Sequence, residues 1–140
     1  MDLNSSLKDD PSIPDSEWLL KTVHPSLVKD GITVSSGAFK SHTNLHTSVE
    51  LGSLTTPEDT LKRRPGDAGV VRLVTGAVRG IRPGVLGVMR DPTPESESGP
   101  ANPAHAIIIR QLKPKRVYRE TAYRLADLCR WVIGPGPARP

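Results

Sequence analysis

The chain has 140 residues, of which 36% are hydrophobic and 24% are charged, a composition typical of one folded domain. No apolar run approaches the ~20 residues that span a bilayer, and the polar, acidic start of the chain does not have the pattern of a signal peptide. The single cysteine, Cys129, excludes an internal disulfide, and we therefore expect a reducing, cytoplasmic location.

The amino-terminal segment predicts a flexible tail. Residues 1–16 contain Pro11, Pro14 and several serines and aspartates without apolar periodicity. We therefore expect order to begin near Trp18, with a single domain over residues 17–133. Removal of residues 1–15 is predicted to change the melting temperature little.

Three short segments predict the first strands. Residues 18–23 are mostly apolar and stop shortly before Pro25, which disfavours a helix at that point. Residues 32–34 lie between two glycine turn signals, and residues 47–51 alternate in the way a half-buried strand does.

The middle of the chain predicts a short helix followed by two strands and a loop. Thr56 is a good cap for a helix near residues 57–63, where Pro57 suits the first helical position. The β-branched residues of 69–76 predict a strand, and residues 85–89 predict another. Four prolines within residues 91–103 predict a loop.

The last part of the chain carries the two strongest patterns. Residues 105–109 form a continuous apolar run, which predicts a central strand covered on both faces. Residues near 115–133 predict a long helix with a buried stripe that ends at Gly134-Pro135. That stripe consists of Tyr118, Ala122, Leu125, Cys129 and Val132. Residues 134–140 predict a flexible tail rich in proline and glycine.

These elements together predict an α+β fold. We expect a mostly antiparallel sheet of four to six strands with a short helix near 57–63. A long carboxyl-terminal helix near 115–133 is expected to cover one face of this sheet.

His105 is the first candidate for a functional residue, because it lies where the proline-rich loop meets the predicted central strand. A histidine there suits a general base or a phosphate contact near neutral pH. Arg90 and Arg110 are the candidate ligand-binding cations beside it. The alternative is a partly buried histidine that hydrogen bonds to a nearby carbonyl group.

Charge is unevenly distributed along the chain. Residues 1–17 carry five acidic residues against one lysine, whereas residues 110–140 carry eight basic residues against two acidic ones. Such a basic segment suits nucleic-acid binding or, equally, an ordinary solvated helix face. The candidate phosphate contacts are Lys113, Lys115, Arg116 and Arg119.

No metal or cofactor site is predicted. His42 and His46 lie four residues apart, but turn-forming residues surround them and no third ligand accompanies them. Cys129 falls on the apolar side of the predicted helix, where a thiol is buried and inert.

The order of several short segments resembles that of a group of small bacterial proteins without an established activity. The segments start at Trp18-Leu19-Leu20, include Asn102-Pro103-Ala104-His105, and end near Trp131, so the resemblance covers residues 18–133. It implies a bacterial origin and one compact domain, and it places interest on the Pro-Ala-His segment.

The absence of a coherent acid, base and nucleophile set favours a non-catalytic interaction or regulatory protein with a protein partner. One alternative is a small enzyme that acts on a phosphate-bearing ligand through His105. The other is a nucleic-acid-binding protein that uses its basic carboxyl-terminal helix.

Overall fold

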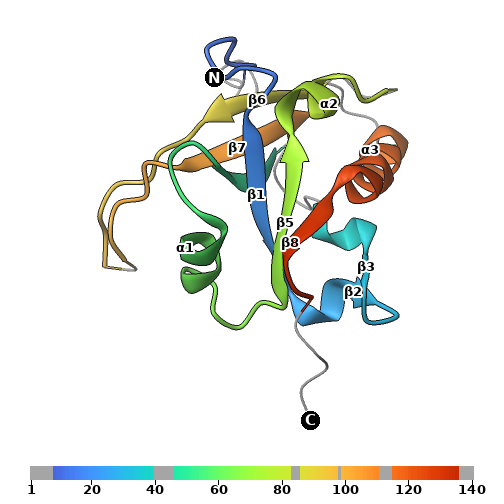
Figure 1. Cartoon of the computed structure of the whole chain (residues 1–140). Coiled ribbons are helices and arrows are strands. Elements are labelled where there is room, and N and C mark those ends of the chain that lie inside the picture. The colour runs from blue at the N-terminus through green and yellow to red at the C-terminus, as the bar shows by residue number, and fades with distance from the viewer. Residues whose placement is uncertain (1–7, 40–45, 83–85, 98, 111–114, 136–140) are drawn as a thin grey trace.

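The computed structural model describes residues 8–39, 46–82, 86–97, 99–110 and 115–135, and the side chains of its last helix from residue 119 on (Figure 1). The strands are β1 (Trp18–Val23), β2 (Val28–Lys29), β3 (Thr33–Val34), β4 (His46–Leu51), β5 (Gly69–Val74), β6 (Leu86–Arg90), β7 (His105–Arg110) and β8 (Arg130–Ile133). The α-helices are α1 (Pro57–Lys62), α2 (Thr75–Arg79) and α3 (Lys115–Leu128), and two 3-10 turns are η2 (Pro25–Leu27) and η3 (Ser36–Phe39).

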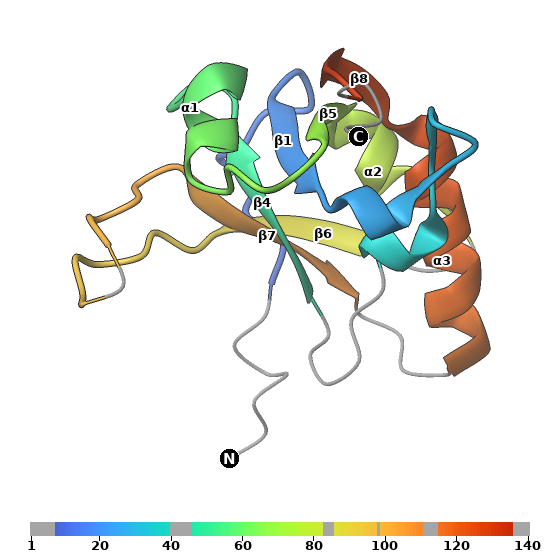
Figure 2. The ribbon, with the colours of Figure 1, turned by 90° about the horizontal axis from the view of Figure 1, so that it is seen from below.

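Six strands form one antiparallel sheet in the order β6-β7-β4-β1-β5-β8, and β2 and β3 form a separate small hairpin. In Figure 1 and Figure 2, α1 and α3 lie on opposite sides of the β1–β5 pair. The chain between β6 and β7, residues 91–104, projects from the body and is called the arm below.

One face of the sheet carries the main hydrophobic core. Alternate residues of the strands point to that face, where α3 and η3 cover them. Phe39 of η3 is fully buried there, and Thr121, Ala122 and Leu125 of α3 are fully buried as well. The strands contribute Leu19, Val23, Val49, Leu51, Val71, Leu73, Leu86, Val88, Ala106 and Ile108.

The predicted fold is wrong in its helical part. The long carboxyl-terminal helix near 115–133 does not form, because α3 ends at Leu128 and residues 130–133 are strand β8. β8 pairs with β5 at the edge of the sheet. A Cβ atom at Gly69 would lie 2.1 Å from the Ile133 carbonyl oxygen, so only glycine permits this close approach. The structure is a mostly antiparallel sheet with short helices.

The reason for the error lies in residues 129–133. Their apolar spacing extends the helical stripe, but Trp131, Val132 and Ile133 are also residues that favour strands. The tertiary structure offers them the open edge of β5, where their backbone groups find partners that an extra helical turn does not provide. The Trp131 indole also donates to the Ile32 carbonyl oxygen at 2.7 Å.

Residues 8–16, predicted as part of a flexible tail, are instead held against the body and are called the strap below. Ile13 is fully buried in the core. The Asp10 amide donates to the Val88 carbonyl oxygen at 2.8 Å, and the Val88 amide donates to Asp9 Oδ1 at 2.9 Å. The strap therefore covers the outer edge of β6.

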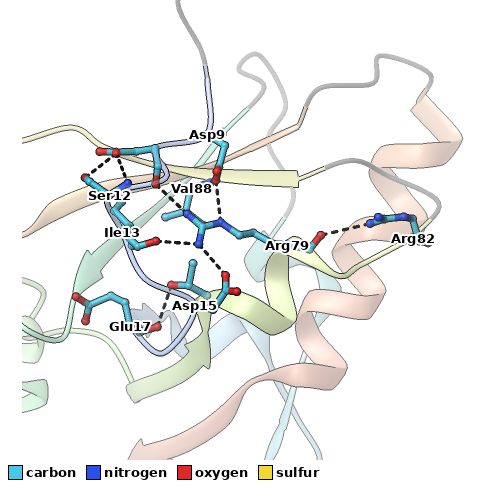
Figure 3. Close-up of polar contacts among 10 residues, drawn as sticks. Asp9, Ser12, Ile13, Asp15, Glu17, Arg79, Arg82 and Val88 are labelled. Atoms are coloured by element: carbon cyan, nitrogen blue, oxygen red, sulfur yellow. Dashed lines mark hydrogen bonds and ion pairs between the residues drawn. The ribbon is translucent and has the colours of Figure 1, made fainter.

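Arg79, the last residue of α2, fastens the strap (Figure 3). Its guanidinium donates to Asp9 Oδ1 at 3.0 Å and to Asp15 Oδ1 at 2.8 Å. It also donates to the carbonyl oxygens of Ile13 and Asp10, each at 2.8 Å. A strand is predicted over residues 69–76, but β5 ends at Val74, and residues 75 and 76 belong to helix α2.

Other predictions fall partly outside the described residues. Of the tail predicted over 134–140, only residues 134 and 135 are described. Within the described part of the chain, no helix is long and apolar enough to cross a membrane.

Candidate functional site

A cleft opens where β1 and β4 separate. Their ladder consists of the pairs Leu19–Leu51 and Leu20–Glu50, whereas β1 pairs with β5 along its whole length. Figure 2 shows β4 diverging from β1 beyond this short ladder. The cleft there has a volume of about 980 Å³ and is lined by both strands, by α1 and the residues after it, and by the arm.

Lys21 of β1 lies at the point where the strands part. It falls on the core face of the sheet, between the buried Leu19 and Val23, so its stem follows apolar surface. Its Nζ donates to the Ser48 carbonyl oxygen of β4 at 3.3 Å and lies 6.0 Å from the centroid of the Phe39 ring. The amine thus occupies the gap between the two strands.

Lys21 has no carboxylate within ion-pair distance among the described residues. Burial lowers the pKa of its ammonium group to about 8, Asp67 opposes the shift, and Arg64 adds to it. Arg64 also lines the cleft, and its side chain makes no hydrogen bond or ion pair with the described residues. Two cations therefore share the cleft without a carboxylate bound to either.

Glu50 of β4 forms the second polar centre of the cleft. Its Oε1 accepts from Thr60 Oγ1 at 2.8 Å and from Arg63 Nη2 at 2.6 Å. Its Oε2 accepts from Arg63 Nε at 2.9 Å and from Asn102 Nδ2 at 2.8 Å. The carboxylate therefore joins α1 to the arm across the sheet.

These hydrogen bonds decide the ionisation of Glu50. Burial by itself raises the pKa of Glu50, but the hydrogen bonds from Arg63, Thr60 and Asn102 outweigh it and hold the pKa below its ordinary value. The group is ionised at neutral pH, and its charge is matched by Arg63. Glu50 therefore braces the walls of the cleft and does not form an ion pair with Lys21.

His105 lines the same cleft, and it is the cross-strand partner of Glu50 in the β4–β7 ladder. Its Nδ1 donates to the Asp91 carbonyl oxygen at 2.8 Å and lies 3.2 Å from Asp91 Oδ2. Because a carbonyl oxygen only accepts, a neutral His105 carries its proton on Nδ1 and keeps Nε2 as an acceptor. The hydrogen bond to the Asp91 carbonyl oxygen is the contact expected of His105 in the structural alternative, and a functional role of this residue stays a prediction.

The two arginines predicted to accompany His105 do not line the cleft. Arg90, on edge strand β6, forms an ion pair with Asp10 of the strap, with Nε 3.6 Å from Oδ2. Arg110 is 4% exposed, and its Nη2 donates to the Phe39 carbonyl oxygen. Both arginines therefore have other partners than His105, although Arg90 lies opposite Ala106 in the β6–β7 ladder.

The predicted nucleic-acid contacts are described only in part. Lys113 lies outside the described residues, and the side chains of Lys115 and Arg116 are not described. Arg119 is exposed on α3, on the opposite side of the β1–β5 pair from α1. His42 also lies outside the described residues. Cys129 is buried, and burial raises the pKa of its thiol to about 11.

Sequence reasoning missed five polar residues that determine the charge and the hydrogen bonds of the cleft: Lys21, Glu50, Arg63, Arg64 and Asn102. One signal was present, because a lysine within an apolar strand segment needs either solvent or a partner. Nothing in the sequence indicates that β1 and β4 part beside it, since a ladder's length depends on strand twist and on neighbouring elements.

Comparison of the chain with protein-family models, curated proteins and solved structures finds no match. The resemblance to a group of small bacterial proteins therefore stays a prediction, and the functional argument depends on the cleft.

Proposed function

We propose that the protein is a binding protein that takes up a small anionic molecule, a carboxylate or a phosphate, in the cleft between β1 and β4. The observation that carries the proposal is the Lys21 ammonium group at the strand gap, which has no carboxylate partner among the described residues. A poorly solvated cation without a counterion gains from an anion that enters the cleft.

The surroundings of Lys21 support an anionic ligand. Arg64 supplies a second cation, whose side-chain donors make no hydrogen bond within the described part of the chain, and an arginine binds a planar carboxylate or a phosphate with two parallel hydrogen bonds. Asp67 also lines the cleft, and its negative charge favours the protonated form of Lys21. The volume of about 980 Å³ lies within the range of small-molecule sites, so the cleft also accommodates an organic body attached to the anionic group.

The arrangement supports binding rather than acid–base catalysis. A carboxylic acid that acts as a general acid near neutral pH has a raised pKa, whereas the pKa of Glu50 is lowered. Its oxygens are occupied by donors from three residues that brace the cleft. This is consistent with the non-catalytic regulatory role that the sequence predicts, with the anion as the regulating ligand.

The proposal is tested by titrating ¹⁵N-labelled protein with inorganic phosphate and, separately, with malonate, against sodium chloride at equal ionic strength. We expect amide shifts around Lys21, Ser48 and Arg64 that saturate. The Lys21→Met variant is expected to bind at least about tenfold more weakly, because a hydrogen bond to a charged group contributes ~1.5–3 kcal/mol. The two anions distinguish a phosphate site from a carboxylate site.

Lys62→Gln is the matched control. Lys62 also lines the cleft, but its side chain is 80% exposed and its partner is Asp59 at 3.8 Å, so its removal is expected to leave affinity nearly unchanged. Shifts that equal those in sodium chloride, or an equal loss in the Lys21→Met and Lys62→Gln variants, would refute a specific anion site.

The other functional predictions stay open alternatives. Use of His105 as a base in a small enzyme keeps one favourable observation, its position in the same cleft. A protein partner, a nucleic-acid surface on α3 and a cytoplasmic location stay predictions from the sequence. In the anion titration, a response confined to α3 would favour the nucleic-acid alternative over the cleft.

A further inference from the structure

We infer that the cleft captures its ligand covalently and reversibly, through an imine between Lys21 Nζ and the carbonyl group of an aldehyde or ketone that also bears an anionic group. The inference extends the proposed function, because it depends on an anion entering the same cleft. It adds the ligand's second chemical feature and the atom that binds it.

The position of Lys21 suits a nucleophilic amine. Its Nζ makes one hydrogen bond to a described residue, at 3.3 Å to the Ser48 carbonyl oxygen, which leaves two of its three hydrogens without a protein acceptor there. The amine lies over the Phe39 ring, and the apolar side chains of Leu27 and Ala38 also line the cleft. A lysine that is desolvated and beside another cation is the activated form of this nucleophile.

The charges around the amine suit the same chemistry. Arg64 disfavours a second positive charge at Lys21 and provides donors for the anionic group of a ligand. Asp67 acts against Arg64, because its negative charge raises the pKa of Lys21. The titratable and charged residues of the cleft are Lys21, His24, Glu50, Asp59, Lys62, Arg63, Arg64, Asp67 and His105. Of these, Glu50 is already matched by Arg63, and Asp59 lies 3.8 Å from Lys62.

The reaction consists of an addition and a dehydration. The lone pair of neutral Lys21 Nζ forms a bond to the carbonyl carbon, and the π pair of the C=O bond moves to oxygen, which takes up a proton as nitrogen loses one. The carbinolamine then loses its hydroxyl group and the remaining amine proton as one molecule of water. The product is an imine, no oxidant or reductant takes part, and added water reverses the reaction.

The experiment uses pyridoxal 5′-phosphate as a probe that carries both an aldehyde and a phosphate. Pyridoxal is the comparison compound, which has the aldehyde but no phosphate. The full chain is incubated with each probe at pH 7.5 and reduced with sodium borohydride, and the labelled lysines are mapped by mass spectrometry. We expect Lys21 to be labelled about tenfold faster than Lys62, which is 80% exposed. We also expect pyridoxal to label Lys21 several-fold more slowly.

The pH dependence adds a second readout. Labelling of Lys21 is expected to rise to half its maximum near pH 8, the pKa of its amine. Labelling of Lys21 no faster than Lys62 in the wild-type chain would overturn the imine.

The phosphate titration and the lysine labelling of the wild-type chain together separate this inference from the anion site. Lys21→Arg checks the labelled position, because arginine is not a nucleophile and this variant is expected to lose the labelling at position 21. If the wild type binds phosphate but Lys21 is not preferentially labelled, the imine is wrong and the anion site stands. If phosphate binding fails as well, the proposed function is wrong.

Discussion

At the scale of single residues, the main feature is a lysine placed on the core face of a strand. Lys21 lies between Leu19 and Val23, and a charged group there costs stability unless it reaches a partner. The partner is the Ser48 carbonyl oxygen, which is within reach because β1 and β4 have already separated. The separation of the two strands thus gives the Lys21 ammonium group its hydrogen-bond acceptor.

This cost predicts a stability that varies with pH. Below pH 8 the Lys21 amine is protonated in the folded and in the unfolded chain. Between pH 8 and 10.5 the unfolded chain binds a proton that the folded chain has lost. The free energy of unfolding therefore gains a contribution as pH rises through this window. Lys21→Met is expected to be more stable than the wild type at pH 7 by about 1–3 kcal/mol. The reason is that burial lowers the pKa of Lys21 in the wild type, so its charge at pH 7 costs stability.

Urea denaturation of both chains at pH 7 and pH 10 checks this expectation. The difference between the two chains is the quantity of interest, because Cys129, whose thiol pKa is raised by burial to about 11, contributes equally to both chains. The advantage of Lys21→Met is expected to shrink at pH 10, and an advantage that stays constant would contradict the lowered pKa of Lys21.

At the scale of elements, polar side chains hold irregular segments where backbone ladders do not. The strap is fastened by Arg79 of α2, and the arm is tied to β4 and α1 through the hydrogen bond from Asn102 to Glu50. Among its described residues the arm has two isolated bridges of its own, Thr93–Asn102 and Ser96–Gly99. A guanidinium or a carboxylate therefore contributes to holding each of these segments in place.

Arg79→Ala is expected to lower the free energy of unfolding by about 2–3 kcal/mol. The change removes ion pairs to Asp9 and Asp15 and leaves the Ile13 and Asp10 carbonyl groups without a donor (Figure 3). Chemical denaturation measures the loss. Hydrogen exchange adds a local readout, because the Val88 amide, which donates to Asp9, is expected to exchange faster.

Arg82→Ala is the matched control, since Arg82 is exposed and its hydrogen bonds to described residues go to nearby carbonyl groups, those of Arg79 and Ile81. Its effect is expected to stay within about 0.5 kcal/mol. Equal losses in the two variants would show that Arg79 does not act through the strap.

At the scale of the whole molecule, the sheet has one edge that the strap covers. The Asp10 amide donates to the carbonyl oxygen of Val88 in β6, and the Val88 amide donates to the Asp9 carboxylate. The strap lies so close to β6 that a Cβ atom at Gly87 would lie 2.8 Å from Asp9 Cβ. An uncovered strand edge pairs readily with a second chain. The strap therefore completes the fold and protects it from association.

This arrangement reverses the truncation result expected from the sequence. Removal of residues 1–15 is expected to lower the melting temperature by several degrees, because it deletes the fully buried Ile13 and the partners of Arg79. It is also expected to increase self-association through β6. Thermal melting and analytical ultracentrifugation measure the two effects.

Removal of residues 1–7 alone is the control for this truncation, because it leaves the strap of residues 8–16 intact. The shorter deletion is expected to keep the melting temperature and the monomer fraction of the full chain. A longer deletion that behaves in the same way would show that the strap contributes nothing to stability or to edge protection.

The sequence by itself determined the features that neighbouring residues decide. Thr56 Oγ1 accepts from the Asp59 amide at 3.1 Å at the start of α1, and the apolar run at residues 105–109 lies within β7, which pairs with a strand on each side, β6 and β4. A cap needs only a side chain three residues away, and a buried strand needs only continuous apolar residues.

Tertiary structure alone decided the fate of residues 129–133, the position of residues 8–16 and the cleft itself. The first became a strand because β5 has an open edge, and the second became a strap because Arg79 is 64 residues or more away in the chain yet adjacent in space. The cleft gathers Lys21, Glu50 and Asn102 from three distant segments. Their meeting depends on where two strands part, which is a property of the whole sheet and is absent from any local pattern.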